Sequence, residues 1–172
     1  MPRYEVFDHT ADLGILFEGR DLADLFESAA FAVFDLMTEL PAVEERRTHR
    51  FVVTGGDRED LLVNFLRELL YLFNGRGFLV RRCAVRIDAA GAPETSAPSR
   101  PAPSEAGRGA VEAVSVGSAP VPPQWRLEAE AAGEPFAPDR HRMKMEIKAV
   151  TYHGLEIRET PAGWRGRIVC DV

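Results

Sequence analysis

Two stretches of the chain place apolar residues at the three- and four-residue spacing of an amphipathic helix. The first follows Asp21 and runs to about residue 37, and the second follows Asp57 and covers residues 58–74. An aspartate at this position can cap a helix by accepting a hydrogen bond from a free backbone N–H. The glycines at 75 and 77 are residues that tolerate the left-handed conformation at a helix end. The pattern therefore predicts two capped helices whose apolar stripes pack into a core.

Several shorter segments alternate apolar and polar residues, which is the pattern of a strand with one buried face. Leu13, Ile15 and Phe17, for example, share one face of a predicted strand. The expected strands are 3–7, 13–18, 50–54, 79–87, 125–131, 143–150, 154–159 and 164–172. Because strands are numerous and do not alternate strictly with helices, the predicted class is α+β, with a largely antiparallel sheet packed with two amphipathic helices.

The segment 88–123 differs sharply in composition from the rest of the chain. It holds seven of the twelve prolines and not one Leu, Ile, Met, Phe, Tyr or Trp. Such a segment cannot bury enough apolar surface to offset the entropy lost on ordering. We therefore predict one domain over residues 1–172, in which 88–123 is a long, flexible, disordered insertion in the hairpin formed by 79–87 and 125–131.

Charge and composition exclude several classes of protein. The chain has 21 basic and 27 acidic residues, a net charge of −6, which argues against a dedicated nucleic-acid binder. Cys83 and Cys170 lie far apart, so they indicate neither a zinc site nor a disulfide framework. No long apolar run predicts a membrane span, and the charged N-terminus does not resemble a secretory signal. A cytoplasmic location is therefore expected.

The strand pattern also predicts a cluster of carboxylates. If 13–18 and 164–172 pair in antiparallel fashion, Asp12 at the start of one lies beside Asp171 at the end of the other. The α-carboxylate of Val172 would add a third acidic group. Carboxylates held close together repel unless a proton or cation intervenes, and such oxygens suit Ca²⁺ or Mg²⁺. The alternative interpretation is two solvated aspartates at strand ends.

A catalytic interpretation rests on His9, which Asp8 or Asp12 could orient as a general base. A metal-dependent phosphoesterase using Asp12 and His9 is therefore one alternative function. The sequence, however, contains no nucleophile motif, no glycine-rich phosphate loop and no HExxH pair. We therefore assign no catalytic residue and expect a protein that is not itself an enzyme.

Four motifs, taken in order, resemble one known family. They are residues 4–14 (YEVFDHTADLG), the run 133–136 (GEPF) followed by His141, residues 147–155 (IKAVTYHGL), and a final hydrophobic strand with Asp171 as its penultimate residue. In this order and spacing the chain is similar to the archease family. The insertion at 88–123 departs from the family pattern but touches none of these motifs.

The resemblance implies an accessory protein of an RNA ligase that uses a guanylylated histidine. Such a ligase joins 2′,3′-cyclic-phosphate or 3′-phosphate ends to 5′-hydroxyl ends in tRNA splicing and RNA repair. The archease partner would promote guanylylation and multiple turnover, contacting RNA only indirectly. The resemblance also implies a metal site at Asp12, Asp171 and Val172, usually holding calcium, with magnesium or manganese as alternatives. An older interpretation of the family, a general chaperone or assembly factor, is the other alternative.

Overall fold

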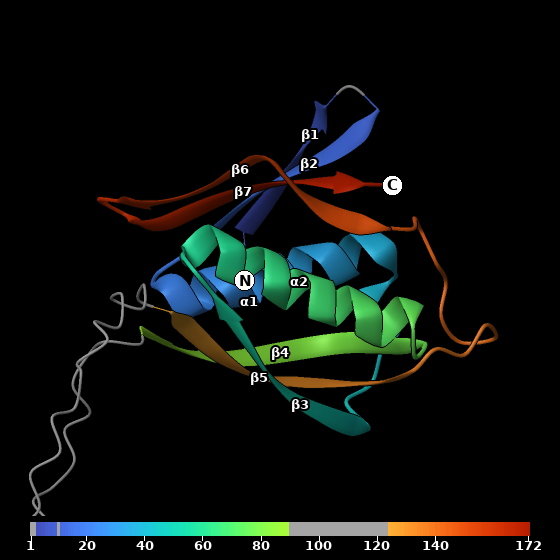
Figure 1. Ribbon diagram of the computed structural model, residues 1–172. Helices are drawn as coiled ribbons and strands as arrows, with labels where there is room; N and C mark the ends of the chain where they lie inside the picture. Colours follow the sequence, from blue (N-terminus) through green and yellow to red (C-terminus); the bar gives the residue numbers. More distant parts are fainter. Residues whose placement is uncertain (1–2, 10, 90–123) are drawn as a thin grey trace, which may run out of the picture.

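The computed structural model describes residues 3–9, 11–89 and 124–172. In these residues, two helices lie between two antiparallel sheets (Figure 1). The helices are α1 (Leu22–Met37) and α2 (Arg58–Asn74), and a short 3₁₀ turn, Leu40–Ala42, follows α1. The predicted α+β class with antiparallel strands and two helices is confirmed.

The first sheet has four strands in the order β1-β2-β7-β6, and the second has three in the order β3-β5-β4. Every pairing within them is antiparallel. The strands are β1 (Arg3–His9), β2 (Asp12–Gly19), β3 (Arg47–Gly55), β4 (Phe78–Ala89), β5 (Trp125–Pro135), β6 (Ala149–Thr160) and β7 (Gly163–Asp171). The core lies between the sheets, where the helices contribute fully buried side chains such as Phe26, Phe34 and Phe65.

Both helices begin as the sequence predicts. The Asp21 carboxylate accepts a hydrogen bond from the Asp24 N–H at 2.8 Å, and the Asp57 carboxylate accepts one from the Asp60 N–H at 2.7 Å. These bonds satisfy backbone donors that have no partner within a helix. At the end of α2, Gly77 has a positive φ of 62°, whereas Gly75 remains in the right-handed region. The left-handed termination is therefore confirmed at the second glycine only.

The predicted hairpin around the insertion is confirmed, and its strands are longer than expected. Ala89 pairs with Trp125, so the first two residues assigned to the insertion belong to β4. The remainder of the predicted insertion, 90–123, lies outside the described residues. On the other side β5 continues through Gly133, where a side-chain Cβ would lie 1.8 Å from the Leu79 carbonyl oxygen. Glycine allows this close backbone approach, so the strand predicted over 125–131 continues past its expected end to Pro135.

The predicted strand over 143–150 is wrong for residues 143–148. Met143 forms a single bridge to Thr38, and regular pairing begins only at Ala149. The alternating pattern has another cause, because the segment runs past the end of α1, where the Lys144 N–H donates to the Met37 carbonyl at 2.8 Å. Alternate residues such as Ile147 are buried without a neighbouring strand in a sheet. Period-two burial indicates an extended chain here, not a strand.

Neither of the two helices combines the length and the apolar character needed to cross a membrane, which holds for all residues that the structure describes.

Candidate functional site

The predicted acidic residues lie at the same end of the four-stranded sheet. The pairing of β2 with β7 runs up to Leu13 and Cys170, and Asp12 and Asp171 are the next residue of each strand beyond this pair. Figure 1 shows the start of β2 and the C-terminus at the same end of the sheet. The antiparallel neighbourhood inferred from the sequence is therefore present, while occupancy by a metal remains a prediction.

A tight turn delivers Asp12 to this position. His9 and Asp12 are the last pair of the β1–β2 ladder, so two residues connect the strands. The second of these, Ala11, has a positive φ of 70°. A residue with a Cβ pays a conformational penalty there, and such strain collects where the surrounding structure or a function requires it. The strain thus lies directly next to the first aspartate of the site.

Asp171 and Val172 are exposed, and Asp12 is partly buried. The main chain before β6 holds this end of β7, because the Lys148 N–H donates to the Asp171 carbonyl at 2.8 Å. The Lys148 ammonium also donates to the Val172 main-chain oxygen at 3.2 Å. A positive charge therefore already lies among the oxygens that were predicted to attract a cation. Lys148 was part of the family motif in the sequence, but its contact with Val172 was not foreseen.

The donor set at this end is small. Over residues 3–9, 11–89 and 124–172, no group of three His, Cys, Asp or Glu side chains is arranged to hold a metal ion. Asp12 and Asp171 supply two carboxylates, and the third ligand of the predicted site is a main-chain oxygen of Val172. In the predicted site that oxygen belongs to the α-carboxylate of Val172, so all three are hard oxygen donors, the type that Ca²⁺ and Mg²⁺ prefer. Their chemistry fits such an ion, with water needed to complete its coordination.

A second cluster of polar groups is buried near the end of β5. Glu134 is 2 % exposed, and Arg140 donates to its two carboxylate oxygens at 2.8 and 3.1 Å. The Glu44 N–H donates to it at 2.8 Å, and Arg46 lies 3.2 Å away. These donors, led by Arg140, lower the pKa of the Glu134 carboxyl to about 2. Glu134 is therefore a buried carboxylate that is ionised and fully paired.

His141 belongs to the same cluster. Its Nδ1 accepts a hydrogen bond from the Ala137 N–H at 2.9 Å, so the ring proton lies on Nε2, which is 2.9 Å from the Glu134 carboxylate. Both ring nitrogens of His141 are therefore satisfied within the buried cluster. The sequence marked Glu134 only as part of a motif. No pattern in the sequence indicates that it is the centre of a buried network, because its donors come from other segments.

The remaining candidates for chemistry are the two cysteines and the histidines at 9 and 153. Burial raises the pKa of both cysteine thiols, Cys83 and Cys170, to about 12, so neither is a nucleophile near neutral pH. His153 is exposed and does not join the acidic end in any group suited to a metal within the described residues. The side chain of His9 lies outside the described residues, so the catalytic hypothesis built on it is not tested.

These features define an α+β protein of two sheets and two helices, with exposed carboxylates at one strand end and a buried ionic cluster. The family model described as the Archease protein family matches residues 4–100 and 109–172. The chain therefore belongs to the archease family.

Individual relatives agree with this assignment over the full length. The chain is 33 % identical over 173 residues to protein archease of Pyrococcus abyssi, covering 100 % of both chains. It is 31 % identical to protein archease of Methanosarcina acetivorans, covering 99 % of this chain and 96 % of that one. Among solved structures it is similar to the solution structure of protein 1598 of Methanobacterium thermoautotrophicum. The TM-score is 0.68 at 27 % identity, with 98 % of each chain covered.

Proposed function

We propose that this chain is a non-catalytic accessory protein of an RNA ligase that works through a guanylylated histidine. The ligase would join 2′,3′-cyclic-phosphate or 3′-phosphate ends to 5′-hydroxyl ends in tRNA splicing or RNA repair. The accessory protein would promote guanylylation of the ligase and so allow multiple turnover. The observation that carries this proposal is the match to the archease family along nearly the whole chain.

The acidic strand end is the part of the molecule that we assign to this role. Asp171 and Val172 are exposed, and the register brings Asp12 beside them. The side chains of Asp12 and Asp171, with the main-chain oxygen of Val172, would hold a divalent cation, calcium or alternatively magnesium or manganese. A bound cation would offset the repulsion between the carboxylates and could link them to oxygen ligands of the partner.

The overall charge supports contact with the ligase in preference to RNA. The net charge of −6 opposes tight independent binding to a phosphate backbone. Exposed carboxylates at the end of a sheet are suited to steer toward, and dock against, a basic rim on a protein partner. RNA would then be affected only through the ligase.

The test separates the two steps of the ligase. Purified ligase, GTP and Mn²⁺ are combined with and without this protein, and radiolabelled GTP measures guanylylation. Joining is measured separately, in a single turnover of ligase that is already guanylylated. We expect Asp12→Ala and Asp171→Ala to abolish the stimulation of guanylylation and to leave the joining step unchanged.

Glu159→Gln is the matched control, because it removes one exposed negative charge at the opposite end of the β6–β7 pair. It should stimulate guanylylation like the natural protein. Full stimulation by both aspartate variants would contradict the assignment of the acidic strand end. Absence of any stimulation by the natural protein, together with suppression of aggregation of unrelated proteins, would instead support the chaperone alternative.

A further inference from the structure

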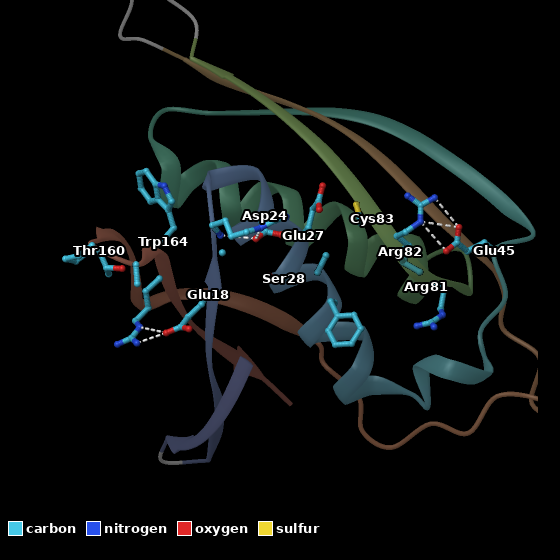
Figure 2. Close-up of a pocket in the computed structure, with 18 residues that line it drawn as sticks. Glu18, Asp24, Glu27, Ser28, Glu45, Arg81, Arg82, Cys83, Thr160 and Trp164 are labelled. Atoms are coloured by element: carbon cyan, nitrogen blue, oxygen red, sulfur yellow. Dashed lines mark hydrogen bonds and ion pairs between the residues drawn. The ribbon is translucent and has the colours of Figure 1, made fainter. Parts of the chain in front are cut away.

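A large cavity lies away from the acidic strand end. It has a volume of about 1080 Å³ and is bounded by α1, the first half of β4 and the neighbouring ends of β2 and β7. Figure 2 shows the labelled side chains around it, with Asp24, Glu27 and Ser28 of α1 near Cys83 of β4. Cavities that bind small molecules commonly measure about 300–1,000 Å³, so this one has the size of a ligand site. The proposed ligase role makes no use of it.

Charged residues line the cavity in equal numbers, four arginines and four carboxylates, and most of them pair with each other. Three ion pairs account for six of the eight, at N–O distances of 3.1, 3.1 and 2.5 Å: Arg20–Asp24, Arg82–Glu45 and Arg165–Glu18. The remaining carboxylate, Glu27, accepts a hydrogen bond from the Val85 N–H of β4 at 2.9 Å. Glu27 and Arg81 are therefore the two charged lining residues outside these ion pairs, and Glu27 still has a hydrogen-bond donor in Val85.

Arg81 has an unusual position in the backbone. Val80 pairs with Gly133 and Arg82 pairs with Ala132, so Arg81 is the extra residue of a β-bulge. A bulge reverses the regular alternation of side chains and redirects the residue that it contains, and bulges are common beside functional sites. In Figure 2 dashed lines join Arg82 to Glu45, whereas none reaches Arg81. The bulge therefore adds a second, separate guanidinium to the wall of the cavity.

The environment of Arg81 also differs from that of the other arginines. Ten described arginines form ion pairs with carboxylates, and four more lie over aromatic rings. Of the two others whose side chains the structure describes, Arg47 is exposed to solvent, and Arg81 is partly buried. Removing a guanidinium from water without a counter-charge is unfavourable. A partly buried guanidinium that lines a cavity and has no ion-pair or aromatic partner within residues 3–9, 11–89 and 124–172 marks a position where an anion would be stabilised.

The remaining wall of the cavity is suited to an apolar group. Phe31 and Trp164 supply aromatic surface, and Ala30 and Val80 supply aliphatic surface. The Ser28 hydroxyl and the neutral Cys83 thiol add uncharged polar groups. Apolar surface and uncharged polar groups beside the Arg81 guanidinium offer contacts for both the body and the polar group of a small organic molecule.

We propose that this cavity binds a small organic anion, whose carboxylate or phosphate group pairs with Arg81 and whose apolar body lies against the wall formed by α1 and β4. The site is distinct from the acidic strand end and does not depend on the ligase. Carboxylate and phosphate share the chemistry that Arg81 recognises, since a guanidinium donates paired hydrogen bonds to both.

The test uses four probes and amide chemical shifts of the ¹⁵N-labelled protein, with calorimetry for affinity. Indole-3-acetate carries a carboxylate on an aromatic body, and adenosine 5′-monophosphate carries a phosphate on one. Adenosine has the aromatic body without the negative charge, and inorganic phosphate has the charge without the aromatic body. We expect one of the two organic anions to shift amides of α1 and β4 at millimolar or lower concentration. The anion that binds more tightly identifies the natural group as carboxylate or phosphate.

Arg81→Gln should weaken that binding by roughly tenfold or more, the usual effect of losing a hydrogen bond to a charged group. Arg81→Lys should retain part of it. Arg86→Gln, an exposed residue of the same strand that does not line the cavity, is the matched control and should bind normally. Melting temperatures of the variants establish that each is folded. The proposal is overturned if neither organic anion shifts α1 and β4, if Arg81→Gln binds as tightly as the natural protein, or if adenosine binds equally well.

Discussion

Carboxylates occupy two contrasting environments in this molecule. Glu134 is 2 % exposed, accepts hydrogen bonds from Arg140, the His141 ring and the Glu44 N–H, and forms an ion pair with Arg46. Asp171 lies exposed at the end of β7, beside a second aspartate, Asp12. Glu134 is surrounded by positive and polar groups, whereas the strand end brings two negatively charged residues to the same place.

This difference in environment distinguishes a carboxylate that stabilises the fold from carboxylates that can bind an external ligand. Around Glu134 each carboxylate oxygen already accepts hydrogen bonds, so the cluster has little capacity for another ligand and contributes to the fold. At the acidic strand end, neighbouring negative charges oppose each other, which a cation or a basic partner would relieve. Lys148 already supplies one positive group there, at 3.2 Å from the Val172 oxygen. Carboxylates that are buried and paired on every side therefore indicate structure, and exposed carboxylates at a strand end indicate a place that something external can reach.

The largest effect that this comparison predicts is on stability. Glu134→Ala should lower the free energy of unfolding by about 2–4 kcal/mol, because it leaves Arg140 and His141 without their acceptor. Denaturant unfolding at pH 7 measures the change. Glu130→Ala, which removes an exposed partner of Arg50 on the same strand, should cost less than about 1 kcal/mol. Equal losses in the two variants would show that the buried cluster has no special role.

A second prediction concerns the stability of the folded protein at acidic pH. The pKa of Glu134 is lowered to about 2 by its donors, so the carboxylate is ionised in the folded protein at a pH where it would be protonated in the unfolded chain. Its contribution is then complete above about pH 5 and is lost as the pH falls toward about 2. Glu134→Gln should remove this part of the pH dependence. Unfolding curves measured from neutral pH to about pH 3 should converge for the two proteins; parallel curves would contradict the assignment.

Much of the fold was predictable because local rules and tertiary packing agree. Both helices begin one residue after a capping aspartate, as expected from Asp21 and Asp57. The errors arose where one pattern has two physical causes. Alternating burial before β6 reflects an extended segment that passes the end of α1, and the glycine at 133 permits close packing and does not end a strand. The division of the strands into two sheets is set by tertiary packing that no local pattern records.

The candidate site was predictable for the same reason. Strand phase alone placed Asp12 and Asp171 together, because antiparallel pairing brings the start of one strand beside the end of the other. The buried cluster and the cavity were not predictable. The donors to Glu134 come from the segment after α1 and from the loop after β5, and the position of Arg81 depends on a bulge in β4. Contacts between distant segments carry no periodic signal in the sequence.

The smallest effect on stability is expected at the acidic strand end. Asp171→Asn should change the free energy of unfolding by less than about 0.5 kcal/mol, since the side chain is exposed and its removal also relieves repulsion with Asp12. The difference should appear when a cation is present. Calcium should raise the melting temperature of the natural protein and of Glu159→Gln, because a ligand that binds only the folded state stabilises it, and should leave Asp171→Asn unchanged. Calorimetric titration of the three proteins with Ca²⁺, Mg²⁺ and Mn²⁺ then ranks the ions by their binding affinity. An equal calcium shift in all three would place any cation elsewhere and would remove the contrast between the two groups of carboxylates.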